Sequence, residues 1–374
     1  TNVLYALCAS SRVFMRAIVV CPVVILDQIV RLNYRRIKFL CVVLVEYRVM
    51  KDYIIRKIQS KYRNKYKYTY YDTENHKVNQ KIVKICLDGL YIPPAHDDVK
   101  ISLNKKDKVL AIGYDDKDRP QYIYNKKYTK EQSDKKYDHM IEFGESYKKI
   151  IHQINQDLYT EKDTKNKQIA QILKIVINCC FRIGNDKYAK ENKSYGVSTL
   201  KSEHIKISKD NITIDFIGKK GVRNTCSIKN KKLSKNLRKK KKTLKKDDRI
   251  FSYRKKNKYY KIKSTDVNQY LKRFGDFTTK NFRTWNANIE LITQLLKMDN
   301  DATITQRKKN ISEAVSGVAH KLHNTSSVCK KNYIDPYLIE TYIDDIERFS
   351  GSFKDAFSKE EINDAYIRLL KHRI

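Results

Sequence analysis

The chain contains eight cysteines but no Cys-X-X-Cys pair, and two of them, Cys179 and Cys180, are adjacent. This spacing is poorly suited to a zinc site or to a disulfide framework, so it indicates thiols that stay reduced. The chain also lacks a Gly-X-X-X-X-Gly-Lys-Ser/Thr run, the loop that cradles nucleotide phosphates. We therefore expect no metal site, no cofactor and a reducing compartment.

Long apolar runs are absent as well. The runs at Ala17–Leu26 and Phe39–Val45 are both too short to span a bilayer. They lie in residues 1–50, which are rich in Val and Arg and unlike the rest of the chain. Free cysteines argue against a secretory signal peptide. Because the chain begins with Thr1, we interpret this stretch as upstream sequence read into the open frame, with Met50 as the natural start.

Acidic residues are too few to balance the basic ones. Lys and Arg number 79 against 42 Asp and Glu, which gives a formal net charge of +37 over 374 residues. Such an excess calls for a polyanionic partner, and each cation placed on a DNA phosphate is favoured by counterion release. Nucleic acid is the first candidate partner and an anionic membrane surface the second. The length allows roughly two domains.

The sequence between residues 68 and 135 predicts a small β-rich domain. Short strands are expected at Ile82–Leu87, Val109–Tyr114 and Gln121–Tyr124, with turn residues between them. The acidic turn Asp115–Asp118 separates the last two strands. The tyrosines that alternate on the last strand are typical of half-buried packing.

From residue 136 to 374, apolar residues recur at helical spacing, with one β interruption. There, apolar and polar residues alternate up to Phe216, and Gly218–Gly221 forms a tight turn before Val222–Ile228. The basic run Lys229–Lys246 is interpreted as a mobile, solvated surface rather than a packed element. The pattern as a whole predicts an α+β fold with a mainly helical second domain.

Four separate segments carry residues suited to phosphodiester transfer. That chemistry needs a nucleophile, cations around the phosphate oxygens and a proton for the departing oxygen. The segments are Phe181–Leu200, Phe216–Val222, Asn281–Trp285 and Val318–Pro336.

In order and spacing, these segments resemble the type IB DNA topoisomerases, especially the short poxvirus and giant-virus enzymes. The resemblance covers about Tyr91 to Tyr337, and residues 1–67 match no part of that family. It implies a C-shaped clamp around duplex DNA, built from a β-rich DNA-clamping domain at 68–135 and a catalytic domain at 136–374. Gln121, Tyr122 and Tyr124 match the clamping domain more weakly and are expected to contact DNA.

Carried over position by position, the resemblance implies Tyr333 as the nucleophile and Arg182 and Arg283 as the arginines that hold the scissile phosphate. Lys219 falls on the general-acid lysine. Asn324 occupies the place where poxvirus enzymes usually have a histidine, nine residues before the nucleophile. Since an amide can donate one hydrogen bond to a phosphate oxygen, as a neutral imidazole does, we expect the chemistry to survive this departure.

Other polar residues near these segments receive lesser roles. Lys220 shares the hairpin tip with Lys219 and competes for its role, but the resemblance favours Lys219 and leaves Lys220 as a DNA contact. Lys187 and Tyr188 are expected to face DNA without a catalytic part. His320 and His323 are interpreted as ordinary surface or capping histidines.

The physical chemistry of a phenol supports the same roles. A tyrosine has a pKa near 10, so it attacks at neutral pH only where cations such as Arg182 and Arg283 stabilise the phenolate. Arginine stays charged and contacts two oxygens at once. A 3′-phosphotyrosyl link would keep the energy of the broken bond, so the 5′-hydroxyl could reseal the strand without ATP. Rotation between the two steps would relax supercoils.

Two other functions remain open from the residues. A tyrosine recombinase uses the same Arg, Lys and Tyr chemistry, but it usually carries a helical N-terminal domain and a histidine-rich signature between its arginines. A basic DNA-binding protein without catalysis is the other alternative. We expect a monomer without a membrane partner, located inside a cell: at a virion or viral replication site, or else in the nucleus.

Overall fold

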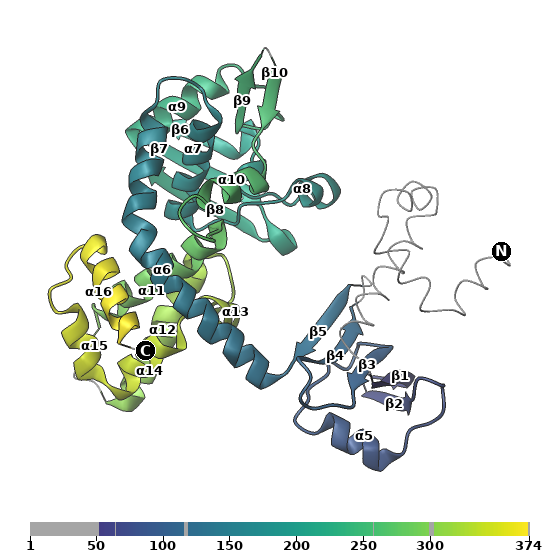
Figure 1. Ribbon diagram of the computed structural model, residues 1–374. Coiled ribbons are helices and arrows are strands. Elements are labelled where there is room, and N and C mark those ends of the chain that lie inside the picture. Colours follow the sequence, from purple (N-terminus) through teal and green to yellow (C-terminus); the bar gives the residue numbers. More distant parts are fainter. Residues whose placement is uncertain (1–51, 64, 116–118, 257, 299–302, 373–374) are drawn as a thin grey trace, which may run out of the picture. The chain divides into compact units, whose positions relative to one another are not determined.

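The computed structural model describes residues 52–63, 65–115, 119–256, 258–298 and 303–372, which fall into two units divided between Asp134 and Lys135 (Figure 1). Strands dominate the first unit and helices the second, so the expected mixed α+β class is confirmed. The interpretation of residues 1–50 and of Met50 lies outside the described residues. None of the helices in the described part of the chain is both long and apolar enough to cross a membrane.

The first unit is built on an antiparallel sheet in the order β2-β1-β3-β4-β5. Its strands are β1 (Tyr53–Tyr62), β2 (Lys65–Tyr71), β3 (Val99–Ser102), β4 (Val109–Tyr114) and β5 (Pro120–Tyr124). The core beneath it includes Ile54, Val99 and Ile101. The last two strands pair as expected, while most of the expected acidic turn between them, residues 116–118, lies outside the described residues.

The β-rich part starts earlier than residue 68, at Tyr53. Strand β1 was missed because one of its inward positions is Arg56, which breaks the apolar alternation. Arg56 is only 4% exposed. Its Nη2 donates to the carbonyls of Pro93 (2.9 Å) and His96 (2.7 Å), and its guanidinium lies over the Tyr68 ring. A buried arginine whose Nη2 donates to two carbonyls thus takes the place of an apolar residue.

The strand expected at Ile82–Leu87 is wrong, because these residues belong to helix α5 (Gln80–Leu87). The Asn79 side chain accepts a hydrogen bond from the Lys81 amide and caps the helix. Val83 and Cys86, three residues apart, face the core together. Eight residues are too few for periodicity alone to separate a helix from a strand.

The second unit contains a three-stranded sheet, in the order β6-β7-β8, among its helices (Figure 1). Its helices are α6 (Lys126–Tyr159), which begins in the first unit, α7 (Lys165–Cys179), α8 (Asp186–Asn192), α9 (Lys231–Lys241), α10 (Ser264–Leu271), α11 (Thr279–Leu295), α12 (Ile304–Lys321), α13 (Ser326–Asn332), α14 (Pro336–Asp344), α15 (Ile346–Phe353) and α16 (Lys359–Lys371). The sheet is formed by β6 (Ile205–Ser208), β7 (Asn211–Ile217) and β8 (Arg223–Lys229), which confirms the expected β interruption.

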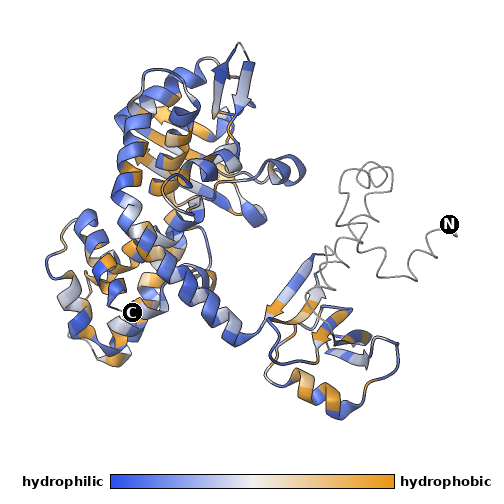
Figure 2. Cartoon of the chain, viewed as in Figure 1, coloured by the Kyte–Doolittle hydropathy of each residue, from blue (hydrophilic) through white to orange (hydrophobic). Residues whose placement is uncertain are grey.

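Helix α11 lies at the centre of the second core. Its Phe282 and Trp285 are fully buried, and the Phe143 ring of α6 meets the Phe282 ring edge-on at 5.0 Å between centroids. Gly144 lets α6 approach Trp285 closely, because a Cβ there would come within 2.4 Å of the Trp285 ring. Figure 2 shows α7 mostly in hydrophobic colours, in keeping with its buried position.

Two features of the second unit differ from the expectations. The run Lys229–Lys246 is not a mobile surface, because it contains helix α9, with Leu233 and Leu237 buried one turn apart beneath its lysines. Lysine stems pack along a surface while their charges stay in water, so a charge run can hide an amphipathic helix. A second β interruption also appears, the hairpin of β9 (Ser252–Lys255) and β10 (Lys258–Lys261).

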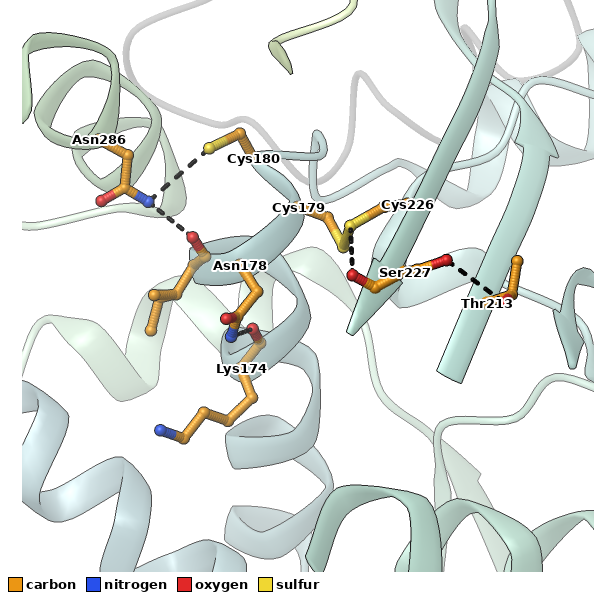
Figure 3. Close-up of a disulfide and its surroundings, with 9 residues drawn as sticks. Lys174, Asn178, Cys179, Cys180, Thr213, Cys226, Ser227 and Asn286 are labelled. Carbon is orange, nitrogen blue, oxygen red and sulfur yellow. Dashed lines mark hydrogen bonds between the residues drawn. A yellow bond between two sulfur atoms is a disulfide. The ribbon is translucent and has the colours of Figure 1, made fainter. Parts of the chain in front are cut away.

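A disulfide overturns the expectation that the cysteines stay reduced. Cys179, the last residue of α7, is bonded to Cys226 of β8 (Figure 3). Cys180 points the other way, and its Sγ accepts a hydrogen bond from Asn286 at 3.8 Å. The adjacency of Cys179 and Cys180 was uninformative, since the partner lies 47 residues away in sequence and is brought close only by the fold.

Candidate active site

A tight turn after α7 carries Arg182. Cys180 takes a left-handed conformation (φ 53°), which ends the helix and turns the chain. Backbone hydrogen bonds from Val197 to Arg182 O (3.0 Å) and from Ser198 to the next carbonyl (2.7 Å) attach the turn to the following loop. Gly196 is required there, because a Cβ would lie 2.6 Å from Arg182 O. The backbone beneath Arg182 is therefore held from two sides.

Arg283 projects from the first turns of α11. The Thr278 side chain caps this helix by accepting from the Lys280 amide. Arg283 is 4% exposed, and its Nη2 donates to the phenol oxygen of Tyr333 (3.2 Å) and to Leu322 O (3.4 Å). Its Nε is buried, and this one donor of the cation has no acceptor among the described residues.

Asn324 lies in the turn between α12 and α13 and faces Arg182. Its Oδ1 accepts a hydrogen bond from Arg182 Nη2 at 2.8 Å, which leaves the amide nitrogen as its remaining polar group. That Nδ2 is buried without an acceptor at full hydrogen-bond geometry among the described residues, although it lies near enough to the Tyr333 phenol to help lower its pKa. Because buried donors are normally satisfied, this amide is suited to bind a ligand oxygen.

Tyr333 occupies the C-cap position of α13 and is half-buried. Its ring lies 5.1 Å from the Arg283 guanidinium carbon. Burial alone raises the pKa of the phenol, but the charge and hydrogen bond of Arg283, joined by Arg182 and Asn324, outweigh it and hold the pKa below its usual value. The site therefore favours the phenolate, which is the nucleophilic form.

The two arginines share one small volume without a carboxylate partner among their described contacts. Burial, and after it the positive charge of Arg283, lowers the pKa of Arg182, while Tyr333 opposes the shift. Like charges this close repel each other, and an anion between them would relieve the repulsion. The arrangement is complementary to a phosphate that carries negative charge on its oxygens.

Lys219 is not part of this cluster. It lies on the tip between β7 and β8, in the turn Lys219–Gly221, and it is exposed, as is Lys220. The tip is tight: Gly218 donates to Val222 O at 2.8 Å and Gly221 takes a positive φ of 74°. The structure thus brings four of the five predicted catalytic residues together and leaves Lys219 in solvent.

The predicted DNA contacts are exposed to different degrees. Lys187 and Tyr188 lie on the exposed face of α8, a few residues after Arg182. On β5, Gln121 is exposed and donates to Asp115 (2.9 Å). The Tyr122 and Tyr124 rings stack at 6.1 Å, with Tyr122 half-buried against the sheet and Tyr124 exposed.

The two histidines near the site have different environments. His320 is exposed at the end of α12, as expected. His323 is not an ordinary surface residue, because its ring packs on Phe181 at 5.4 Å between centroids. Burial first, and then nearby positive charges, lower the pKa of His323, so its ring is neutral at pH 7. It packs against the residue before Arg182 without adding charge to the site.

Sequence reasoning missed Asn288, which is buried on α11 and contacts the backbone around the phenol. Its Nδ2 donates to Tyr333 O (2.9 Å), and its Oδ1 accepts from the Asp335 amide (2.8 Å). An asparagine inside a helix carries no signal of such a role in sequence. Within the described ranges, no group of three or more His, Cys, Asp or Glu residues is placed to hold a metal ion.

Comparisons with known proteins agree with this geometry. The family model "Eukaryotic DNA topoisomerase I, catalytic core" matches residues 125–359. The chain is 32% identical to DNA topoisomerase 1B of Acanthamoeba polyphaga mimivirus, over 76% of this chain and 87% of that protein. It is 26% identical to DNA topoisomerase 1B of vaccinia virus (strain Copenhagen), over 71% and 80% respectively. The match to DNA topoisomerase 1 of Drosophila melanogaster is 27% identical and covers 49% of this chain and 19% of that protein.

Proposed function

The chain belongs to the DNA topoisomerase I family, and from this premise we propose that it relaxes supercoiled duplex DNA by transient cleavage of one strand through Tyr333. It is a type IB DNA topoisomerase, an isomerase that acts on DNA. The observation that carries the proposed mechanism is the hydrogen bond from Arg283 to the Tyr333 phenol, with Arg182 and Asn324 beside it.

In the cleavage step, the Tyr333 oxygen attacks the scissile phosphorus and forms a 3′-phosphotyrosyl bond, while the bond to the 5′ oxygen breaks. Arg283 stabilises the phenolate and, with Arg182, the charge on the non-bridging oxygens. Asn324 already accepts from Arg182, so its Nδ2 is left to donate to a phosphate oxygen. The lowered pKa of Tyr333 supports its role as the nucleophile.

Lys219 supplies the proton to the departing 5′ oxygen. Its exposure on a hairpin tip is consistent with a side chain that enters the site together with DNA. Resealing reverses these steps: the 5′ hydroxyl attacks the phosphotyrosyl bond and Tyr333 leaves. The energy of the broken bond is kept in the phosphotyrosyl bond, so the cycle requires no ATP. Arg182, Arg283 and Lys219 supply the positive charge and the proton, so it requires no metal ion either.

Duplex DNA is held mainly through its phosphates. The net charge of +37 supports this, as do the exposed Lys187, Tyr188 and Lys220 of the catalytic unit. Gln121, Tyr122 and Tyr124 of β5 supply contacts from the other unit. The viral relatives support a location inside a host cell or in a virus. The enzyme acts there as a monomer, in the virion, at the viral replication site or else in the nucleus.

The proposal is tested with supercoiled plasmid in EDTA without ATP. The wild-type chain is expected to relax the plasmid, whereas Tyr333→Phe, which lacks the attacking oxygen, should bind DNA and form no covalent adduct. Adducts are detected on denaturing gels with end-labelled duplex and located by peptide mass spectrometry.

An adduct on another tyrosine would refute the assignment of Tyr333. Relaxation that required a divalent cation would refute the proposed chemistry. Recombinant junctions in the products would instead identify a tyrosine recombinase. Lys330→Met offers a matched control, because Lys330 is an exposed residue on the neighbouring helix α13.

A further inference from the structure

The nucleophile lies in a break between two helices. Helix α13 ends at Asn332 and α14 begins at Pro336, so Tyr333, Ile334 and Asp335 lie outside both. The last carbonyls of a helix have no partner within it, and a proline at the start of the next helix has no N–H to offer. The carbonyls around Tyr333 therefore depend on donors from elsewhere in the fold.

Helix α6 supplies two of these donors from almost 200 residues away in sequence. Lys136 Nζ donates to Asn332 O at 2.7 Å, and the Tyr137 hydroxyl donates to Ile334 O. Helix α11 supplies the donor between them, since Asn288 binds the carbonyl of Tyr333 itself. Three successive carbonyls are thus each held by a side chain from a neighbouring helix.

The donors are fixed in place. Tyr137 is 2% exposed and Asn288 is 1% exposed. The Lys136 ammonium lies over the Tyr137 ring, 4.6 Å from its centroid, and 3.3 Å from its hydroxyl. Burial lowers the pKa of Lys136 to about 8, although Asp335 opposes the shift. Lys136 itself is half-buried, and its ammonium is directed to a carbonyl and an aromatic ring of the protein.

The residue after the break is anchored as well. The Asp335 amide donates to Asn288 Oδ1 at 2.8 Å, and its fully buried carboxylate caps α14 by accepting from Tyr337 N at 3.0 Å. The Tyr366 hydroxyl of α16 donates to the same carboxylate. Lys136 and Tyr137 bind carbonyls on the two sides of Tyr333, so they can act on its phenol through the backbone.

We propose that Lys136 and Tyr137 are positioning residues for the nucleophile, which together with Asn288 hold the backbone on both sides of Tyr333 and so fix the direction of its phenol. This proposal rests on the proposed role of Tyr333. An attacking atom must lie in line with the bond that breaks, and a displacement of about 1 Å can cost about 100-fold in rate. Freeing the carbonyls would let the phenol move away from Arg283.

The experiment measures the first-order rate of adduct formation on an end-labelled duplex at saturating protein. Lys136→Met and Tyr137→Phe each remove one donor. Lys135→Met is the matched control, because it removes one positive charge from the neighbouring, exposed position of the same helix. Duplex affinity is measured for each change in a Tyr333→Phe background, and the thermal midpoint of each variant is recorded.

The positioning role predicts a rate about 10- to 100-fold lower for Lys136→Met and Tyr137→Phe, with duplex affinity unchanged and Lys135→Met close to wild type. Cleavage and resealing should slow by the same factor, because both use the same alignment. Lys136→Arg, which keeps a cationic donor, should recover most of the loss, as a general loss of stability would not.

Equal rates for Lys136→Met and Lys135→Met would overturn the role of Lys136. If Lys136→Met fails to fold, Tyr137→Phe decides, since it deletes a single oxygen atom: a wild-type rate refutes the proposal and a slow rate with unchanged affinity supports it. A wild-type protein without an adduct at Tyr333 would refute the proposed function itself, which keeps the two failures distinct.

Discussion

Two guanidinium groups and one phenol determine the electrostatics of the site. Arg283 contacts the Tyr333 oxygen directly, while Arg182 is oriented through Asn324. The asparagine therefore has two functions in one side chain: its oxygen holds an arginine and its nitrogen stays available for a phosphate. A neutral histidine also offers one acceptor and one donor, but on the two nitrogens of a ring rather than on one short amide, so the two contacts would be spaced differently.

The pH dependence of cleavage should report the lowered pKa of Tyr333. Because the phenolate is the attacking form, the rate of adduct formation rises with pH and reaches its plateau below the usual pKa of tyrosine. Arg283→Ala removes the main group that lowers this pKa. Its rate should therefore be about 100- to 1000-fold lower at neutral pH, with the rise displaced to higher pH.

Rapid-quench measurements of adduct formation across pH at saturating duplex check this expectation. Lys280→Ala is a suitable control, because Lys280 is an exposed residue on the same helix turn. A rise at the same pH in Arg283→Ala and wild type would show that the observed ionisation belongs to another group.

At the scale of elements, the β7–β8 hairpin presents Lys219 at an exposed tip. If this lysine protonates the leaving oxygen, Lys219→Ala should slow cleavage of an ordinary strand by about 100- to 10,000-fold. A substrate with a 5′-bridging sulfur should be slowed far less, because a thiolate departs without a proton. Adduct formation on the two substrates gives the comparison.

The neighbouring Lys220 supplies the control for this prediction. Lys220→Ala loses the same charge from the same turn and should slow both substrates equally, if at all. A Lys219→Ala variant equally slow on both substrates would remove Lys219 from the role of acid.

The elements also show how far sequence reasoning reached. Strands β4 to β8 were predictable, because apolar alternation and turn residues coincide there. Strand β1 was hidden by buried Arg56, α5 by its short length, and α9 by lysines whose stems cover Leu233 and Leu237. In each case tertiary packing gives a residue an environment that its type does not suggest.

The same limit applies to the site. Tyr333, Arg182, Arg283 and Asn324 could be named from four short segments, and the fold brings them together. Lys136, Tyr137 and Asn288 could not be named, because their partners are backbone carbonyls, and any sequence offers a carbonyl at every position. Residues that act through the backbone leave no pattern of spacing to recognise.

At the scale of the whole molecule, the net charge of +37 dominates binding. The logarithm of the duplex affinity of the Tyr333→Phe variant should fall linearly with the logarithm of the salt concentration. With about six to ten phosphate contacts, the loss between about 50 and 200 mM salt is about 10³- to 10⁵-fold. Fluorescence anisotropy with a labelled duplex measures the slope.

The exposed residue Lys187 allows a test of the salt dependence by a single substitution. Lys187→Gln should weaken binding for all sequences alike and reduce the slope by about one, the amount for a single lost phosphate contact. A slope near zero would mean that bases rather than phosphates provide the affinity, against the distribution of exposed lysines.

The bond between Cys179 and Cys226 closes a ring of chain that contains both Arg182 and Lys219. A protease that cuts once at the exposed tip near Lys220 would therefore leave the two fragments attached. They should run as one band on a denaturing gel and separate into two only after a thiol reagent is added, so limited digestion reads the oxidation state of the chain directly.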